Sequence, residues 1–172
     1  MIIFVLGKPD SGKSLKAEEL ATKSGAKHKI YIATMKVMDQ AGEERVKRHR
    51  RQRAGKGFET MEIPMKISLS LPILCKPKEA VPEETVILLE CLSNLVGNEM
   101  HDNPMRQNLD EQEFAKELIN EIGLLSKAAS LLIVVGTMYE IKEDFDEETR
   151  KYIRYLNRTN EEMKKISDRI IE

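Results

Sequence analysis

An eight-residue segment near the N-terminus carries the strongest chemical signal in this sequence. Residues 7–14, GKPDSGKS, match the phosphate-binding pattern GxxxxGK(S/T) in full, between an apolar run and a helix-forming segment. In such a loop the backbone N–H groups surround a phosphate, and the following helix points the positive end of its dipole at it. Lys13 would contact the β- and γ-phosphates, the Ser14 hydroxyl would bind Mg²⁺, and a Cβ at Gly12 would obstruct the backbone's approach. We therefore expect a nucleoside triphosphate to be bound by the whole segment: Gly7, Lys8, Pro9, Asp10, Ser11, Gly12, Lys13 and Ser14.

A second candidate ligand for the metal lies at the end of a later apolar run. Residues 84–90, ETVILLE, have the composition of a buried strand, and Glu90 is its last residue. A metal bound at a phosphate loop usually takes an acidic partner from such a place. We interpret Ser14 and Glu90 as the metal ligands. The alternative for Glu90 is a carboxylate that caps the next helix.

His49 lies in the most basic segment of the chain. The cations around it are Arg45, Lys47, Arg48, Arg50, Arg51, Arg53 and Lys56. Cationic neighbours favour the neutral imidazole, which is nucleophilic, and they attract a triphosphate. His49 is therefore a candidate catalytic residue, with a solvated charged face as the alternative. The net charge of -1 and the absence of aromatic residues among these cations argue against a nucleic-acid partner.

The segments that must position these residues alternate between strand and helix. Strands are predicted at 2–6, 28–34, 58–64, 84–90 and 131–136, with a short one within 168–172. Helices are predicted after the phosphate loop, from Met38 to about Arg53, from Asp110 to about Ala129, and after Asp146. Residues 65–83 are ambiguous, and residues 101–108 are predicted to be a polar loop. This alternation indicates a three-layer α/β fold with a mainly parallel sheet flanked by helices, in a single domain, 1–172.

The composition excludes several classes of protein. With 41% hydrophobic and 33% charged residues, the chain can bury one core, so it is neither disordered nor fibrous. It has no apolar run long enough for a membrane span and no signal-peptide pattern at its start. Cys75 and Cys91 lack the spacing of a metal or disulfide motif, which favours a reducing, cytoplasmic location.

Four segments in order along the chain resemble a known family. They are YIAT (31–34), RVKRHRRQR (45–53), FETMEIP (58–64) and VILLECLSNLVGN (86–98). Together with the phosphate loop, they are similar to the adenosylcobinamide kinase / adenosylcobinamide-phosphate guanylyltransferases of cobalamin biosynthesis. The resemblance implies a P-loop NTPase-like fold and two reactions. One phosphorylates the aminopropanol side chain of adenosylcobinamide from ATP or GTP, and the other transfers GMP from GTP through a guanylylated histidine.

The resemblance also implies roles for individual residues. His49 falls where the family has its guanylylated histidine. Further nucleotide contacts are implied at Ala33, Thr34, Met35, Arg50, Arg51, Gln52, Arg53, Glu62 and Glu90. A corrinoid substrate and, by analogy, a homotrimer follow from the same resemblance. Two other functions stay open: another small-molecule P-loop kinase with His49 merely solvated, and a nucleotide-binding homologue without transferase activity.

Overall fold

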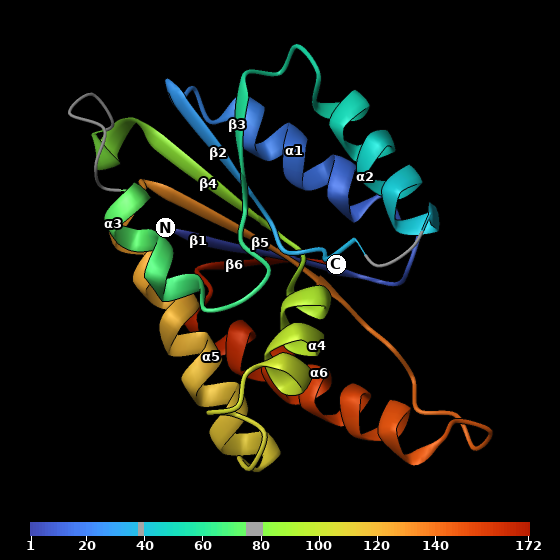
Figure 1. Ribbon diagram of the computed structural model, residues 1–172. Coiled ribbons are helices and arrows are strands. Elements are labelled where there is room, and N and C mark those ends of the chain that lie inside the picture. Colours follow the sequence, from blue (N-terminus) through green and yellow to red (C-terminus); the bar gives the residue numbers. More distant parts are fainter. Residues whose placement is uncertain (38–39, 75–80) are drawn as a thin grey trace.

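A computed structural model describes residues 1–37, 40–74 and 81–172, and within them the strands form one parallel sheet (Figure 1). The order across the sheet is β3-β2-β4-β5-β1-β6, and all the pairings are parallel. The strands are β1 Ile2–Gly7, β2 His28–Ala33, β3 Phe58–Glu62, β4 Thr85–Glu90, β5 Leu131–Thr137 and β6 Arg169–Ile171. The predicted parallel sheet is therefore confirmed.

Helices cover both faces of this sheet. They are α1 Lys13–Lys23, α2 Gln40–Arg53, α3 Leu71–Leu74, α4 Leu92–Asp102, α5 Glu111–Leu125 and α6 Glu147–Ile166. In Figure 1, α1 and α2 lie on one side of the sheet, and α4, α5 and α6 lie on the other. Alternate residues of β1 show the two layers: Ile3 and Val5 pack in the cluster that includes α1, while Phe4 and Leu6 pack with α4, α5 and α6. The predicted three-layer α/β architecture is confirmed.

Some predicted boundaries were wrong. The helix expected to reach about Ala129 ends at Leu125, where the Ser126 hydroxyl donates to the Gly123 carbonyl and a short 3₁₀ helix, Ser126–Ala128, follows. The ambiguous 65–83 segment contains a 3₁₀ helix, Ile67–Ser70, and α3. Met38, the expected start of α2, and Cys75 lie outside the described residues.

The predicted polar loop at 101–108 is not a simple solvated loop. Its first two residues end α4, and Asn103 and Arg106 are buried. They are buried because the carboxylates of Glu99 and Glu121 accept their hydrogen bonds. Burial of such groups is tolerated only when they are paired.

The sheet register brings the candidate site residues to one edge. Gly7 pairs with Thr137, Glu90 pairs with Ala33, and Ala33 also pairs with Glu62. Each of these five residues is the last of its strand, so the carboxyl ends of five strands lie together at one edge of the sheet. In open parallel sheets this is the edge at which ligands bind.

Among the described residues, no helix is both long and apolar enough to cross a membrane.

Candidate functional site

The phosphate loop joins β1 to α1 with the backbone that its sequence predicts. Gly12 precedes the first residue of α1 and has a φ of 82°, and Asp10 has a φ of 56°. The left-handed conformation at Gly12 is a second reason for glycine, beside the approach of a phosphate. At Gly7 a Cβ would lie 2.6 Å from Ser11 Oγ, so a side chain there would require the Ser11 hydroxyl to move. The loop is thus shaped by its own glycines before any ligand binds.

Lys13 folds back over this loop. Its ammonium donates to the Lys8 carbonyl at 2.9 Å, and the backbone N–H of Ser11 donates to the same carbonyl at 3.3 Å. The Lys13 ammonium is therefore held over the loop, where it can exchange this carbonyl for phosphate oxygens.

A cleft of about 1220 Å³ opens along the carboxyl edge of the sheet. It brings together residues from the phosphate loop, the ends of β2, β3 and β4, and α2. The predicted site residues that line it are Pro9, Asp10, Gly12, Lys13, Ser14, Ala33, Met35, His49, Arg50, Gln52, Arg53, Glu62 and Glu90. The predicted site residues that do not line it are Gly7, Lys8, Ser11, Thr34 and Arg51.

His49 faces a buried carboxylate. Its Nδ1 lies 3.8 Å from Oε1 of Glu90, farther than a hydrogen bond, and it is buried without a hydrogen-bond partner among the described residues. The His49 side chain is 25% exposed, so the imidazole still borders the cleft. A carboxylate facing Nδ1 favours the tautomer with its proton on that atom. Nε2 then keeps its lone pair, as a nucleophile requires.

Tyr31 holds the other oxygen of Glu90. The Tyr31 hydroxyl donates to Glu90 Oε2 at 3.0 Å. Burial, together with the Glu90 carboxylate, raises the pKa of Tyr31, so its hydroxyl stays protonated and remains a donor. Glu90 is thereby held by β2 through Tyr31, and its other oxygen faces His49 of α2.

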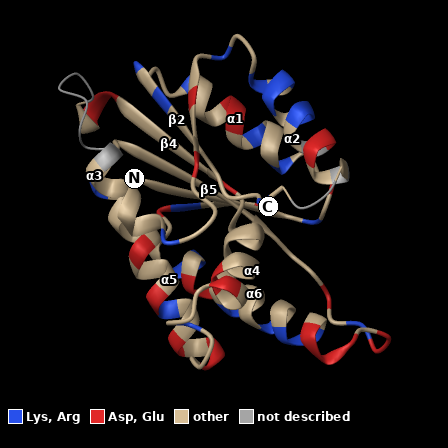
Figure 2. Ribbon diagram, viewed as in Figure 1, with Lys and Arg blue, Asp and Glu red and all other residues tan. Residues whose placement is uncertain are grey.

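α2 is a basic helix anchored at its C-terminal end (Figure 2). Within the turn that follows it, the Lys56 ammonium lies 2.5 Å from a carboxylate oxygen of Glu18 on α1, and Glu18 is 1% exposed. Arg50 forms an ion pair with Glu62 on β3. These contacts hold the face of α2 that bears His49 against the sheet.

Asn98, which the sequence analysis did not single out, stabilises the opposite wall of the cleft. Asn98 of α4 donates to the carbonyls of Thr34 and Pro64, each at 2.8 Å, and so ties together the segments that follow β2 and β3. The Thr34 hydroxyl donates to the Cys91 carbonyl and accepts from the Cys91 N–H. Asn98 ends the VILLECLSNLVGN segment and Tyr31 begins the YIAT segment, but neither was singled out. Tyr31 could have been noted as a polar residue in a buried strand.

The donors in the cleft suit a magnesium ion bound to a nucleotide. Among the described residues, no three His, Cys, Asp or Glu side chains gather as a metal centre. Mg²⁺ bound to a nucleotide takes one or two protein oxygens and draws the remaining ligands from phosphates and water. The Ser14 hydroxyl and the Glu90 carboxylate, which both line the cleft, fit such a donor set.

Comparison with known proteins adds a family and a fold neighbour. A family model described as cobinamide kinase / cobinamide phosphate guanyltransferase matches residues 3–171. None of the curated proteins compared with the chain matches it. Among solved structures the chain is similar to an ATPase domain, with 11% sequence identity and a TM-score of 0.58, over 98% of this chain and 67% of that chain. At that identity the likeness shows the fold alone, and it agrees with the α/β fold predicted from the alternation of strands and helices.

Proposed function

Because the chain belongs to the cobinamide kinase / cobinamide phosphate guanyltransferase family, we propose that it is a bifunctional transferase acting on adenosylcobinamide. It phosphorylates the aminopropanol hydroxyl of that substrate with ATP or GTP, and then transfers GMP from GTP to the new phosphate through a guanylylated His49. The observation that carries this proposal is that His49, the phosphate loop and Glu90 line one cleft.

The phosphate loop serves the kinase reaction. Lys13 and the loop N–H groups bind the triphosphate and stabilise the charge on the transferred phosphoryl group. Ser14 and Glu90 would hold Mg²⁺, Glu90 directly or through water, and such an ion would supply positive charge beside the phosphate oxygens. The substrate hydroxyl attacks the γ-phosphorus and releases its proton to water, the bond from that phosphorus to the bridging oxygen of the β-phosphate breaks, and the nucleoside diphosphate leaves.

His49 serves the guanylyl transfer. Its Nε2 attacks the α-phosphorus of GTP, an N–P bond forms, and pyrophosphate leaves. The phosphate of the substrate then attacks the same phosphorus, the N–P bond breaks, and GMP passes to the substrate with His49 restored. The proximity of Glu90 to Nδ1 supports this role, because the cation that forms on the imidazole would be stabilised by that carboxylate.

The test is covalent labelling with GTP that carries its label on the α-phosphate. We expect label on the parent protein, with pyrophosphate released, and we expect acid to remove it because a protonated phosphoramidate nitrogen is a good leaving group. His49→Ala should lose the label and still bind GTP, because the phosphate loop is a separate element. His28→Ala is the matched control, since His28 begins β2 and does not line the cleft, and it should label like the parent.

Two other results would contradict the proposal. Transfer of a γ-label to adenosylcobinamide without α-label on the protein would leave a kinase in which His49 has no catalytic role. Nucleotide binding without either transfer would indicate a homologue that lacks the chemistry.

A further inference from the structure

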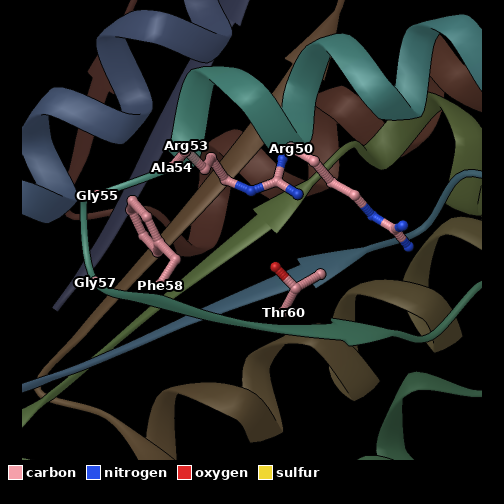
Figure 3. Close-up of a pocket in the computed structure, with 7 residues that line it drawn as sticks. All are labelled: Arg50, Arg53, Ala54, Gly55, Gly57, Phe58 and Thr60. Carbon is pink, nitrogen blue, oxygen red and sulfur yellow. The ribbon is translucent and has the colours of Figure 1, made fainter.

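The cleft at the carboxyl edge of the sheet has room for a second ligand beside a nucleotide. Pockets that hold one small ligand measure about 300–1,000 Å³. This cleft measures about 1220 Å³ and follows α2 along much of the helix. Near the C-terminal end of α2 it is lined by Arg50 and Arg53, which face Thr60 of β3 in a side pocket (Figure 3). The guanidinium groups make that end of the cleft cationic.

The part of the cleft toward the N-terminal end of α2 has an apolar lining instead. Val46 comes three residues before His49, so it lies on the same face of α2, about 4.5 Å farther along the axis. Met35 and Val37, in the segment that follows β2, line the same cleft. Val37 is 50% exposed, while Met35 and Val46 are half-buried. We call Met35, Val37 and Val46 the outer end of the cleft. A ligand with an apolar surface would be stabilised by covering them.

The lysines beside the outer end face carboxylates. Lys36 Nζ lies 2.5 Å from a carboxylate oxygen of Asp102, the last residue of α4, and Lys47 Nζ lies 3.9 Å from one of Glu43. All four residues line the cleft. The ammonium of Lys13, by contrast, donates to an uncharged carbonyl, so its charge is available to a phosphate. The phosphate loop therefore suits an anion, and the outer end suits a ligand with little charge.

The outer end also adjoins the groups that react. Ala33 pairs with Glu90 in the sheet, and Met35 follows Ala33 by two residues. Val46 is about one helical turn from His49. A ligand that covers the outer end can therefore extend a short arm to the centre of the cleft.

We propose that the outer end, Met35, Val37 and Val46, binds the corrin ring of the acceptor substrate. The inference rests on the proposed function. A corrin ring is broad and apolar on its faces and carries neutral amide side chains at its edge. Ser93 and Asn94, in the first turn of α4, line the cleft and supply uncharged hydrogen-bonding groups for such amides. The aminopropanol arm extends from the ring to the phosphates. One ring site thus serves both transfers, because the arm carries the hydroxyl in the first reaction and the new phosphate in the second.

The first test measures acceptor binding apart from catalysis. Equilibrium dialysis of adenosylcobinamide, followed by its visible absorbance, gives its affinity for each variant. Val37→Asn and Val46→Asn should each weaken this binding by about fivefold, because each replaces an apolar contact with a polar side chain. Both changes are neutral, so the affinity for GTP in calorimetric titration should stay that of the parent. Leu69→Asn is the matched control, since Leu69 is 69% exposed and does not line the cleft, and it should bind both ligands like the parent.

Two results of this test would overturn the proposal. Adenosylcobinamide binding at the parent's affinity in both variants would mean that the ring lies elsewhere. A loss of GTP affinity as large as the loss of adenosylcobinamide affinity would make the outer end part of the nucleotide site. A parent protein that binds no adenosylcobinamide would contradict the proposed function and the ring site together, whereas unaltered variants of a parent that does bind it reject the ring site alone.

The second test asks which part of the acceptor the parent protein recognises. A corrinoid amide that lacks the aminopropanol arm should displace adenosylcobinamide from the protein and leave GTP bound, because the ring and the nucleotide occupy different parts of the cleft. Free aminopropanol should displace neither ligand. If aminopropanol displaces adenosylcobinamide and the corrinoid without the arm does not, the protein recognises the arm and the proposed ring site is wrong.

Discussion

At the scale of single residues, Lys13 is the side chain proposed to contact the triphosphate. In the structure its ammonium is satisfied by one backbone carbonyl, which a phosphate oxygen would replace. Lys13→Ala should weaken GTP binding by about 1.5–3 kcal/mol, tenfold or more, since a charge-assisted hydrogen bond is removed. Calorimetric titration measures this loss.

The fold should tolerate the change at Lys13, because the hydrogen bond that its ammonium donates goes to a carbonyl of the loop itself. The thermal unfolding curve of Lys13→Ala should overlay that of the parent. If the folded variant binds the nucleotide as tightly as the parent, the phosphate loop is not part of the nucleotide site.

Glu90 is the residue on which two proposed roles converge. Its carboxylate accepts from Tyr31, faces His49 and is the proposed acidic partner of Mg²⁺. Glu90→Gln should raise the Mg²⁺ concentration needed for half-maximal transfer, because an amide is a poorer ligand for a hard cation than a carboxylate. A magnesium titration of kinase turnover measures this. Glu59→Gln makes the same change at an exposed carboxylate of β3 that does not line the cleft, so it is the control and should keep the magnesium requirement of the parent. If Glu90→Gln needs the same Mg²⁺ concentration as the parent, Glu90 does not hold the metal.

At the scale of elements, the starts of two helices were among the most predictable parts of the fold. A helix was predicted to begin at Asp110, and the Asp110 carboxylate accepts from the N–H groups of Gln112 and Glu113 while Glu113 accepts from the Asp110 N–H. The buried strands were equally readable, because their apolar runs match a sheet covered on both faces. These signals are local, so a sequence displays them directly.

The geometry of the site was less predictable, for a physical reason. The approach of His49 to Glu90 depends on how α2 packs on the sheet, and that packing involves the contact between Lys56 and Glu18 across 38 residues. Asn98 donates hydrogen bonds to carbonyls of two distant segments, so its residue type alone does not indicate that role. The sequence could nominate the site residues but could not show how they face one another.

The cap of α6 makes a prediction about pH. The backbone N–H of Thr149 donates to the Asp146 carboxylate and holds the pKa of that group below its usual range. The charged cap is therefore favoured in the folded state, and its contribution to stability is present above the ordinary Asp pKa of about 4. It is lost as the pH falls further, through the lowered folded-state pKa.

Asp146→Ala should lower the urea midpoint of unfolding at pH 7, and its difference from the parent should shrink as the pH falls below about 4. Urea unfolding at pH 7, 4 and 3 measures this. Asp144→Ala, an exposed carboxylate two residues earlier, serves as the control and should follow the parent throughout. A difference that is the same at every pH would mean that the charge of Asp146 plays no part.

At the scale of the whole molecule, a buried arginine joins α5 to α4. Arg106 is 4% exposed, and its guanidinium lies 2.6 Å from Glu121 and 3.6 Å from Glu99. Arg106→Met would leave these carboxylates without their cation and should cost about 3–5 kcal/mol of the free energy of unfolding. Urea denaturation followed by circular dichroism measures the loss.

Arg154→Met is the matched control for that loss. Arg154 also approaches two carboxylates, Glu111 and Glu147, but its side chain is 43% exposed. Exposed ion pairs contribute at most about 1 kcal/mol, so this variant should stay near the parent. Equal small losses in the two variants would show that the buried network does not stabilise the fold.

The position of β1 in the sheet has a consequence for how the molecule is made. Both strands that flank β1 come from the final third of the chain, since Ile2 pairs with Leu132 and Phe4 pairs with Ile170. During synthesis the strand that leads into the phosphate loop therefore emerges long before both of its neighbours, and contacts of such sequence separation form slowly. A nucleotide that requires the ordered loop binds only chains whose sheet has closed around β1, and by mass action it stabilises those chains alone. Nucleotide capture by nascent chains of increasing length would thus report the moment at which the sheet is complete.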